Sequence, residues 1–593
     1  MTTLDPDISW DLEPLLPEPG EAGVKALLDR ADALTDHLST YRGRIADLDA
    51  DGLVGLVAGF AELRDLMGRA GNYAGLAFSI DTADPSRGAL MQRVEERSIA
   101  ISTRLVFFEL EWAALDDERV ETLLSDARLD DARHYLRSLR RYRPHLLSEA
   151  EEVVLAEKSV TGRGAWERLF EELVSSIELD LDGARVSLEA GLSRLHTPDR
   201  AERRAAAEAV TAGLAPGLRT RAYVFNTLLA DKATDDRLRR HATWISSRNL
   251  DNEASDESVR ALIEAVQGRY SIPQRWYAIK ARLLGLDRLA DYDRNASVAE
   301  SEDAVGWDDA RALVAESYRA FSPDLADVVE LFFADAWIDA PVRPGKRPGA
   351  FCAYTVPSHH PYLLLNWTAT RRDVLTLAHE LGHGAHAYLA REQGVFHQST
   401  PLTLAETASV FGETLTFGRL LGVTTDPAER LALLASNLED QIATVFRQIA
   451  MNRFEDAVHT ERREVGELSV ERFGELWTAS QQAMLGDAVE ITDGYRSWWS
   501  YIPHFIATPG YVYAYAFGQL LALSVYAEYE AQGPDFVPQY LELLRRGGSM
   551  PPEELGRLVG VDLADPAFWD RGLDLVERRL VETEQAARDA GRL

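Results

Sequence analysis

The stretch TRRDVLTLAHELGHGAHAYLAREQG, residues 370–394, predicts a capped amphipathic helix. Thr370 and Asp373 have the spacing of a capping box, and Gly394 is typical of a residue at which a helix ends. Between these signals, apolar residues recur at helical spacing and form one stripe: Val374, Leu377, Ala378, Leu381, Ala385 and Tyr388. We therefore expect a helix with one face packed against a core.

Two histidines and a glutamate lie on the face beside this stripe. His379 and His383 are one turn apart, so both imidazoles can reach a single metal ion. Glu380 follows the first histidine and can reach a water molecule beside the same ion, which is the H-E-x-x-H arrangement of zinc peptidases. Two core histidines with a surface glutamate are the alternative, and the capped amphipathic helix argues against it.

A zinc ion in a catalytic site takes a third protein ligand and leaves one position open. The metzincin pattern requires glycine and histidine at the positions of His386 and Leu389, so this pattern is excluded. His386 shares the histidine face but lies about 10.5 Å from His379 along the helix axis. We therefore interpret His386 as a core residue or as one that supports the ligands from behind.

A glutamate from the next helix is the remaining solution for the third ligand. We expect this helix over residues 403–420, with Glu406 near its start and Glu413 two turns later on the same face. Glu406 is the preferred ligand, and Glu413 would then support the ligands from behind. The reverse assignment stays open, and Glu392 at the end of the first helix is a less favoured candidate.

This donor set predicts one zinc ion per chain, although cobalt or manganese could occupy the same ligands. Such a site predicts peptide-bond hydrolysis, with Glu380 as the general base that takes a proton from the attacking water. The aromatic segment 498–505, which contains His504, and the nearby Tyr511 and Tyr515 are candidate donors to the oxyanion. Core packing is the alternative for a segment so rich in aromatic residues.

Composition limits the partners of the chain. It has 63 basic and 96 acidic residues and a formal net charge of -33, which disfavours nucleic acid and anionic membranes as partners. Its N-terminal residues lack the pattern of a signal peptide. A single cysteine, Cys352, excludes an internal disulfide and fits a reducing compartment, so we expect a cytoplasmic protein.

The rest of the chain reads as mainly α. The first ~175 residues show helical spacing throughout, and residues 177–188 then alternate around Asp182-Gly183, which predicts a hairpin. Thr197 followed by proline predicts the start of another helix. We place a domain boundary near residue 195, which divides the chain into a helical domain, 1–195, and a catalytic domain, 196–593. Apolar runs at 350–356 and 362–367 predict two strands beside the zinc helix.

Four blocks of sequence, taken in order, resemble the oligoendopeptidase F branch of the thimet-oligopeptidase-like (M3) metallopeptidases: GKRPGAFC (345–352), LLNW (364–367), TLAHELGH (376–383) and LAETAS (404–409). Residues 135–149 are similar to the N-terminal domain of that branch, so the resemblance covers about residues 115–580. It implies a mainly α, two-lobed protein with a small β-sheet beside the zinc helix. It also implies a deep substrate channel that admits only short unstructured peptides.

The resemblance also implies roles for particular residues. Glu406 would be the third zinc ligand, and His504 would lie on the oxyanion side. Gly349, Ala350 and Asn366 would line the substrate backbone. Many relatives carry aromatic residues at two positions where this chain has Ile506 and Gly510, so Tyr511 is our first choice as the oxyanion donor and Tyr515 the second.

Two other functions are compatible with the same residues. A zinc carboxypeptidase or dipeptidase would need a basic residue near the metal to hold a free carboxylate, and four residues could serve: Lys346, Arg347, Arg371 and Arg372. A non-catalytic peptide-binding protein would need the scaffold but not the base, and the presence of Glu380 argues against it. The sequence leads us to expect an oligoendopeptidase that cleaves internal peptide bonds.

Overall fold

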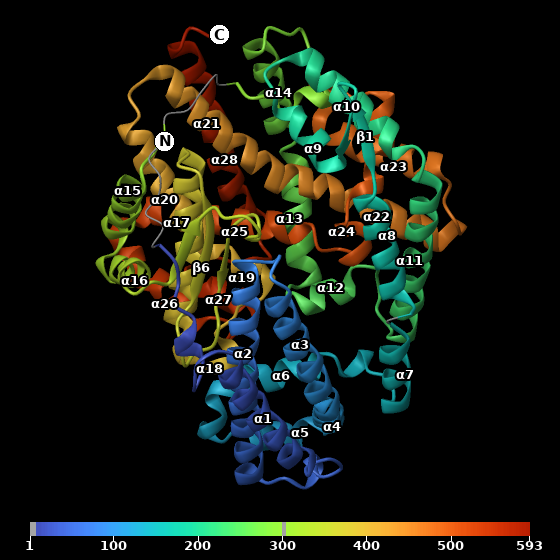
Figure 1. Ribbon diagram of the computed structural model, residues 1–593, viewed down its shortest axis with the longest axis vertical. Coiled ribbons are helices and arrows are strands. Elements are labelled where there is room, and N and C mark those ends of the chain that lie inside the picture. The colour runs from blue at the N-terminus through green and yellow to red at the C-terminus, as the bar shows by residue number, and fades with distance from the viewer. Residues whose placement is uncertain (1–7, 160, 299–303) are drawn as a thin grey trace. The chain divides into compact units, whose positions relative to one another are not determined.

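The computed structural model describes residues 8–159, 161–298 and 304–593, and these residues are mostly helical (Figure 1). Three small sheets lie within the described residues, with strand orders β1-β2, β3-β7 and β4-β6-β5. The expected class, mainly α with a small sheet, is therefore confirmed. No helix within the described residues is both long and apolar enough to cross a membrane.

The described residues group into two compact units. Unit 1 takes residues from 1–146, 303–420 and 525–562, and unit 2 takes residues from 147–302, 421–524 and 563–593. Each unit is therefore assembled from three separate segments of the chain. The division at residue 195 stays a prediction, because the two units follow contacts in space and not the order of the chain.

Unit 1 contains the segments that the sequence marks as a metal site. Its helices are α1 (Gly20–Ser39), α2 (Ala50–Ser79), α3 (Pro85–Leu105), α4 (Phe107–Ala114), α5 (Asp117–Leu124), α6 (Arg133–Arg141), α15 (Trp307–Phe321), α16 (Pro323–Ala334), α17 (Arg371–Ala390), α18 (Gly394–His397), α19 (Leu402–Ala405), α26 (Val537–Arg546) and α27 (Pro552–Leu558). Its strands are β4 (Ile338–Pro341), β5 (Phe351–Ala353) and β6 (Tyr362–Trp367). The helices α20 (Thr407–Val423) and α25 (Tyr513–Gln532) each contain a boundary between the units.

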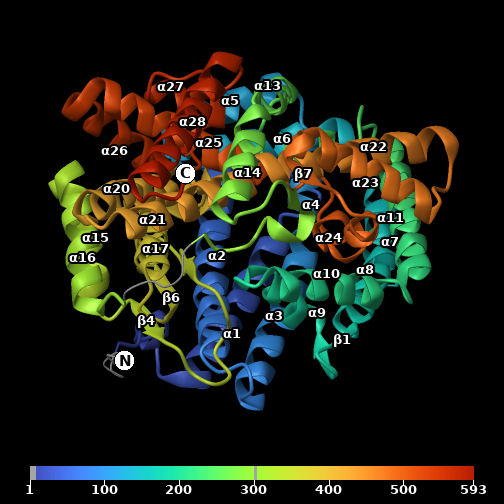
Figure 2. The ribbon, with the colours of Figure 1, turned by 90° about the horizontal axis from the view of Figure 1, so that it is seen from above.

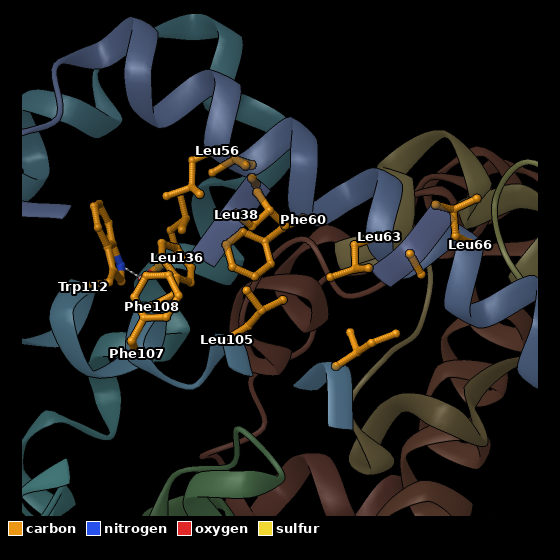
Figure 3. Close-up of a cluster of buried hydrophobic side chains, with 14 of the residues drawn as sticks. Leu38, Leu56, Phe60, Leu63, Leu66, Leu105, Phe107, Phe108, Trp112 and Leu136 are labelled. Carbon is orange, nitrogen blue, oxygen red and sulfur yellow. Dashed lines mark hydrogen bonds between the residues drawn. The ribbon is translucent and has the colours of Figure 1, made fainter. Parts of the chain in front are cut away.

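The N-terminal helices of unit 1 enclose an aliphatic and aromatic core (Figure 3). The rings of Phe60 in α2 and Phe108 in α4 lie 4.7 Å apart between centroids. Trp112 is fully buried, and its indole Nε1 donates to the carbonyl oxygen of Leu136 at 2.8 Å. Burying this polar atom is tolerated because it has a hydrogen-bond partner. The helical reading of this part of the sequence is confirmed.

The three-stranded sheet of unit 1 is built around β6. Both strands expected from the apolar runs are present, and β5 pairs with β6 antiparallel. The sequence analysis missed β4, which lies on the other side of β6 and runs parallel to it. Nearly all of β6 is buried, as the continuous apolar run of a central strand predicts. Both ribbon views place α17 beside β6, so the sheet supports the helix that carries the histidines (Figures 1 and 2).

Unit 2 is also helical. Its helices are α7 (Glu149–Ser159), α8 (Arg163–Ser175), α9 (Leu188–Ser193), α10 (Arg200–Leu214), α11 (Leu218–Leu238), α12 (Ser246–Asp251), α13 (Asp256–Gly268), α14 (Ser271–Leu283), α21 (Pro427–Gln441), α22 (Gln448–Val465), α23 (Val470–Leu485), α24 (His504–Ala507) and α28 (Pro566–Asp589). Its strands are β1 (Glu178–Leu181), β2 (Ala184–Ser187), β3 (Leu289–Ala290) and β7 (Val489–Glu490). The parallel pair β3-β7 was not expected from the sequence.

The hairpin of unit 2 is confirmed and the start of the next helix is corrected. Asp182 and Gly183 join β1 to β2, and both have positive φ, at 54° and 78°. This is the conformation that an Asp-Gly turn favours between right-handed strands. Helix α10 is capped by Asp199 and not by Thr197, because the Asp199 carboxylate accepts from the backbone N–H groups of residues 201 and 202. A carboxylate at the N-cap is favoured both by these bonds and by the helix dipole.

Candidate metal centre

Helix α17 presents the two histidines. The hydroxyl of Thr370 accepts from the backbone N–H of Asp373, and the Asp373 carboxylate accepts from the backbone N–H of Thr370, so the expected capping box is present. The apolar stripe of the helix is buried except for Tyr388, which is half-buried, and His379 and His383 are half-buried on the adjoining face. Their rings lie 5.0 Å apart between centroids. The local sequence therefore determines the direction in which both imidazoles point.

Glu406 reaches the histidines from a break between two helices. We expected one helix over 403–420, but the chain forms the short α19, makes a turn at Glu406 and then begins α20. Gly382 allows this arrangement, because a Cβ at that position would lie 2.4 Å from the carbonyl oxygen of Ala408 and 2.6 Å from the Cα of Ser409. The backbone that follows Glu406 thus packs directly against α17 between the two histidines.

The three candidate ligands have the separations of a zinc site. The Oε2 atom of Glu406 lies 3.3 Å from Nε2 of His379 and 3.5 Å from Nε2 of His383. With zinc–ligand bonds of about 2.0–2.1 Å, tetrahedral geometry places neighbouring donor atoms about 3.3–3.4 Å apart. The donor atoms of all three residues lie within 4.8 Å of one another. The residues present therefore fit a zinc ion, with Glu406 in the position of the third ligand.

Two residues behind the candidate ligands orient them. Nδ1 of His379 lies 3.1 Å from Oε2 of Glu413, so a proton on Nδ1 leaves Nε2 free for a metal ion. The Ser409 hydroxyl donates to Oε2 of Glu406 at 2.7 Å. We had not singled out Ser409, although its spacing of three residues from Glu406 across a helix start could have indicated it.

His386 has a different environment from the other two histidines. It is buried, and neither of its ring nitrogens has a hydrogen-bond partner within the described part of the chain. Burial lowers its pKa to about 3, so the imidazole is neutral at ordinary pH. A role for His386 in supporting the ligands stays a prediction.

The electrostatics of the site suit a cation and a base. Burial by itself would raise the pKa of Glu406. Hydrogen bonding to His379 and His383 outweighs this effect and holds the pKa well below its usual range. Glu380 is 7% exposed, and burial raises its pKa above the ordinary value. Its Oε2 atom is buried without a hydrogen-bond partner among the described residues. A carboxylate that is desolvated and unpartnered is a strong acceptor for a proton.

The loop before β5 is held by Asn366. Its side-chain nitrogen donates to the carbonyl oxygens of Arg347 at 2.9 Å and of Gly349 at 2.8 Å. Gly349 is exposed with φ +84°, a conformation that favours glycine, and Ala350 next to it is half-buried. Asn366 therefore orients the loop that carries these two residues, and contact of all three with a substrate stays a prediction.

The remaining candidates lie together in unit 2. Nε2 of His504 lies 3.1 Å from the Tyr515 hydroxyl, and the His504 ring stacks against Tyr511 at 5.9 Å between centroids. The two tyrosine rings are 5.1 Å apart at nearly right angles. Burial, followed by the charge of Arg447, lowers the pKa of His504, so its imidazole favours the neutral form. The aromatic segment thus forms a compact cluster of hydroxyl and imidazole groups.

Tyr354 is a further residue that the sequence analysis missed. Its ring lies 6.4 Å from that of His383 between centroids. Burial, with smaller effects from Glu406 and Glu380, raises its pKa well above the ordinary value, so its hydroxyl keeps its proton. No spacing pattern could have indicated it, because Tyr354 follows β5 and comes near the histidines only when the sheet packs on α17.

The fold and the donor set are those expected of a mainly helical metallopeptidase. The family model "Peptidase family M3" matches residues 193–575, and the model "Oligopeptidase F" matches residues 111–178. The chain therefore belongs to peptidase family M3, as its sequence blocks had suggested.

The similarity of this chain to known proteins covers most of its length. Oligopeptidase PepF of Bacillus subtilis (strain 168) is 26% identical, with 97% of this chain and 87% of that protein covered. Group B oligopeptidase PepB of Streptococcus agalactiae is 27% identical, with 86% of each covered. The crystal structure of oligoendopeptidase-F from Enterococcus faecium has a TM-score of 0.73 at 22% identity and covers 95% of this chain and 99% of its own. The fold is thus shared with this structure.

Proposed function

We propose that the chain is a zinc-dependent oligoendopeptidase that hydrolyses internal bonds of short unstructured peptides. The observation that carries the proposal is the arrangement in unit 1. There Glu406 Oε2 lies at tetrahedral separations from the Nε2 atoms of both histidines, and Glu380, whose Oε2 has no hydrogen-bond partner among the described residues, follows the first histidine in sequence. The names of the M3 relatives support the substrate class. The single Cys352 supports a reducing, cytoplasmic site of action.

His379, His383 and Glu406 would hold the zinc ion. When bound there, zinc supplies a Lewis acid for a peptide carbonyl and lowers the pKa of a water molecule. Glu380 accepts the proton of the attacking water at its buried carboxylate and passes it to the nitrogen of the leaving amine. Glu413 keeps the proton of His379 on Nδ1, which leaves Nε2 as the donor atom.

Donors to the developing oxyanion are proposed in the cluster of unit 2. The Tyr511 and Tyr515 hydroxyls and the neutral imidazole of His504 can each donate one hydrogen bond. Tyr511 is the first choice, because the Tyr515 hydroxyl already lies within hydrogen-bond distance of His504. A phenol that keeps its proton can donate to an oxyanion throughout the neutral pH range.

The decisive experiment uses an internally quenched peptide of about ten residues with both ends blocked. We expect zinc-loaded wild type to cleave it at an internal bond. Glu380→Gln, at equal zinc content, should lose about 10²- to 10⁴-fold in kcat, because the amide cannot accept the proton. Equal activity of the two proteins would refute the role of Glu380.

The same peptide with a free C-terminus separates the competing functions. Trimming from the C-terminus, with no cleavage of the blocked peptide, would indicate a carboxypeptidase. Lys346 is a poor candidate to hold a free carboxylate in that case, since its Nζ is buried and bonded to Asp339 Oδ1 at 2.6 Å. Binding of both peptides without turnover would indicate a non-catalytic binding protein.

A further inference from the structure

Unit 2 contains a cavity of about 350 Å³ that the metal site does not use. It is lined by the end of α21, by the segment after β3 and by the aromatic segment around Tyr495 and Tyr501. Its size lies at the lower end of the range for small-ligand sites, about 300–1,000 Å³. Its walls combine aromatic rings with two arginines, Arg294 and Arg447.

Arg447 enters this cavity from an unusual backbone. Residues Ile442–Arg447 form a π-helix between α21 and α22, and such segments occur frequently at functional sites. The Nε atom of Arg447 is buried without a hydrogen-bond partner, and within the described residues its guanidinium pairs with no carboxylate. A cation that is partly removed from water and left without an anion is unfavourable unless something else pairs with it.

Arg294 is held in the same cavity by uncharged oxygen atoms. Its Nε donates to the backbone carbonyl of Asp291 at 3.0 Å, and its NH2 group donates to the Tyr495 hydroxyl at 2.7 Å. Both arginines lie close enough to act on the Tyr277 and Tyr501 hydroxyls. Burial raises the pKa values of these hydroxyls, and the two guanidinium charges lower them. The two cations therefore share one site.

The acidic residues of the cavity leave Arg447 without a partner. Glu439 is bonded to Lys280 at 2.5 Å, and the Asp291 carboxylate accepts from the backbone N–H and hydroxyl of Thr492 at 2.6 and 2.7 Å. Glu189 is exposed at the rim. An incoming carboxylate could accept two parallel hydrogen bonds from the Arg447 guanidinium, which is the geometry that arginine favours.

We propose that this cavity binds a carboxylate group of the peptide substrate, either the C-terminal carboxylate or an acidic side chain, with Arg447 as the residue that recognises it. The inference rests on the proposed peptidase function. Arg447 belongs to the same unit as His504, the candidate residue on the oxyanion side. The formal net charge of -33 would by itself favour cationic peptides, so a preference for a carboxylate would have to arise locally.

The test compares peptides that differ only in one carboxylate. The parent is an internally quenched peptide without acidic residues and with an amidated C-terminus. In the first arm the peptide has a free C-terminus, and the amidated parent is its neutral counterpart. In the second arm the peptide carries a single glutamate at successive positions around the cleaved bond, and the same peptide with glutamine is its neutral counterpart. We expect wild type to prefer one carboxylate peptide over its neutral counterpart by about tenfold or more in kcat/KM.

Arg447→Gln should reduce this ratio to about one, and Arg447→Lys should keep part of it, because lysine retains the charge but loses the planar fork. A loss of activity that affects both peptides equally cancels in the ratio. Arg472→Gln is the matched control, because it removes one positive charge from the same unit at a residue that pairs with Glu461 outside the cavity. This control should leave the ratio unchanged.

Ratios near one for wild type in both arms, or an unchanged ratio in Arg447→Gln, would overturn the proposal. If zinc-loaded wild type cleaves none of the peptides, the proposed function fails separately. The dissociation constants of the same fluorescent peptides, measured by anisotropy with wild type and Arg447→Gln, would then decide the carboxylate preference by themselves. The two arms distinguish a C-terminal carboxylate from an acidic side chain.

Discussion

His379 uses both of its ring nitrogens, and each nitrogen has a different role. Nε2 faces Glu406 and His383, while Nδ1 faces Glu413 at 3.1 Å. A carboxylate behind a histidine ligand fixes the tautomer and raises the basicity of the donor nitrogen. We therefore predict that Glu413 would affect a bound metal ion without touching it.

Glu413→Gln should weaken zinc affinity by about 10- to 100-fold, which competition with a chromogenic chelator would measure. The helical content should stay the same, because the amide has the same shape. Glu392→Gln is the matched control, since Glu392 is exposed and outside the candidate ligand set. Equal affinities of the two variants would contradict the role assigned to Glu413.

Glu455 is a buried acid that predicts a pH-dependent stability. Its Oε1 accepts from the backbone N–H of Gly510 at 2.9 Å, its Oε2 lacks a partner among the described residues, and burial raises its pKa to about 8. Between the unfolded pKa near 4.5 and about pH 8, the native state keeps a proton that the unfolded state has lost. The stability that the protonated carboxyl contributes is complete below about pH 4.5 and is lost as the pH rises to about 8.

Glu455→Gln should therefore gain stability relative to wild type as the pH rises from 5 to 8, by up to about 1.4 kcal/mol per pH unit. Urea denaturation of both proteins at several pH values measures this difference. The difference in stability should stop changing above about pH 8, where Glu455 of wild type is ionised in both the native and the unfolded state. A difference that does not change with pH would show that Glu455 is ionised in the native state.

At the scale of elements, the approach of α20 to α17 brings Glu406 to the histidines. This approach depends on Gly382, because any Cβ there would overlap the backbone of Ala408 and Ser409. Neither segment can move without moving a candidate ligand. The two helices and the short break at Glu406 therefore act as one unit of the site.

Gly382→Ala should lower the melting temperature and weaken zinc binding together, because the backbone after Glu406 must shift outward. Gly418→Ala is the matched control in α20, since nothing lies within 4 Å of a Cβ at that position. Alanine is the better helix former by about 0.5–1 kcal/mol, so the control should be as stable as wild type or slightly more stable. Thermal unfolding and zinc titration of both variants would test this, and unchanged zinc affinity in Gly382→Ala would contradict it.

At the scale of the whole molecule, metal binding should stabilise the folded chain. The donor atoms come from α17 and from the turn before α20, so they lie together only when unit 1 is folded. A ligand that binds the native state alone stabilises it by about 2.7 kcal/mol at a free concentration 100 times its Kd. Zinc is thus expected to contribute to stability as well as to catalysis.

Removing zinc with a chelator should lower the melting temperature, and adding zinc back should restore it. Glu406→Gln should show a much smaller shift, because one ligand of the three is weakened. Differential scanning calorimetry with and without the chelator measures both effects. The same shift in wild type and Glu406→Gln would mean that zinc stabilises the chain at another site.

Local sequence determined the elements whose signals lie within one or two turns. The capping box and apolar stripe of α17, the Asp-Gly hairpin and the strands β5 and β6 were all predicted, because short-range spacing decides which faces are buried. His379, Glu380 and His383 followed from the same helix. The resemblance of four blocks then identified the family.

Tertiary structure decided what depends on contacts between distant segments. Packing that no local pattern encodes decided four features: strand β4, the break at Glu406, the hydrogen bond from the Ser409 hydroxyl to Glu406, and the position of Tyr354 near His383. The cavity at Arg447 is of the same kind, because its walls come from segments more than 200 residues apart. The sequence thus determined which groups are candidates for the chemistry, and the fold decided which of them meet, since only packing brings distant side chains within bonding distance.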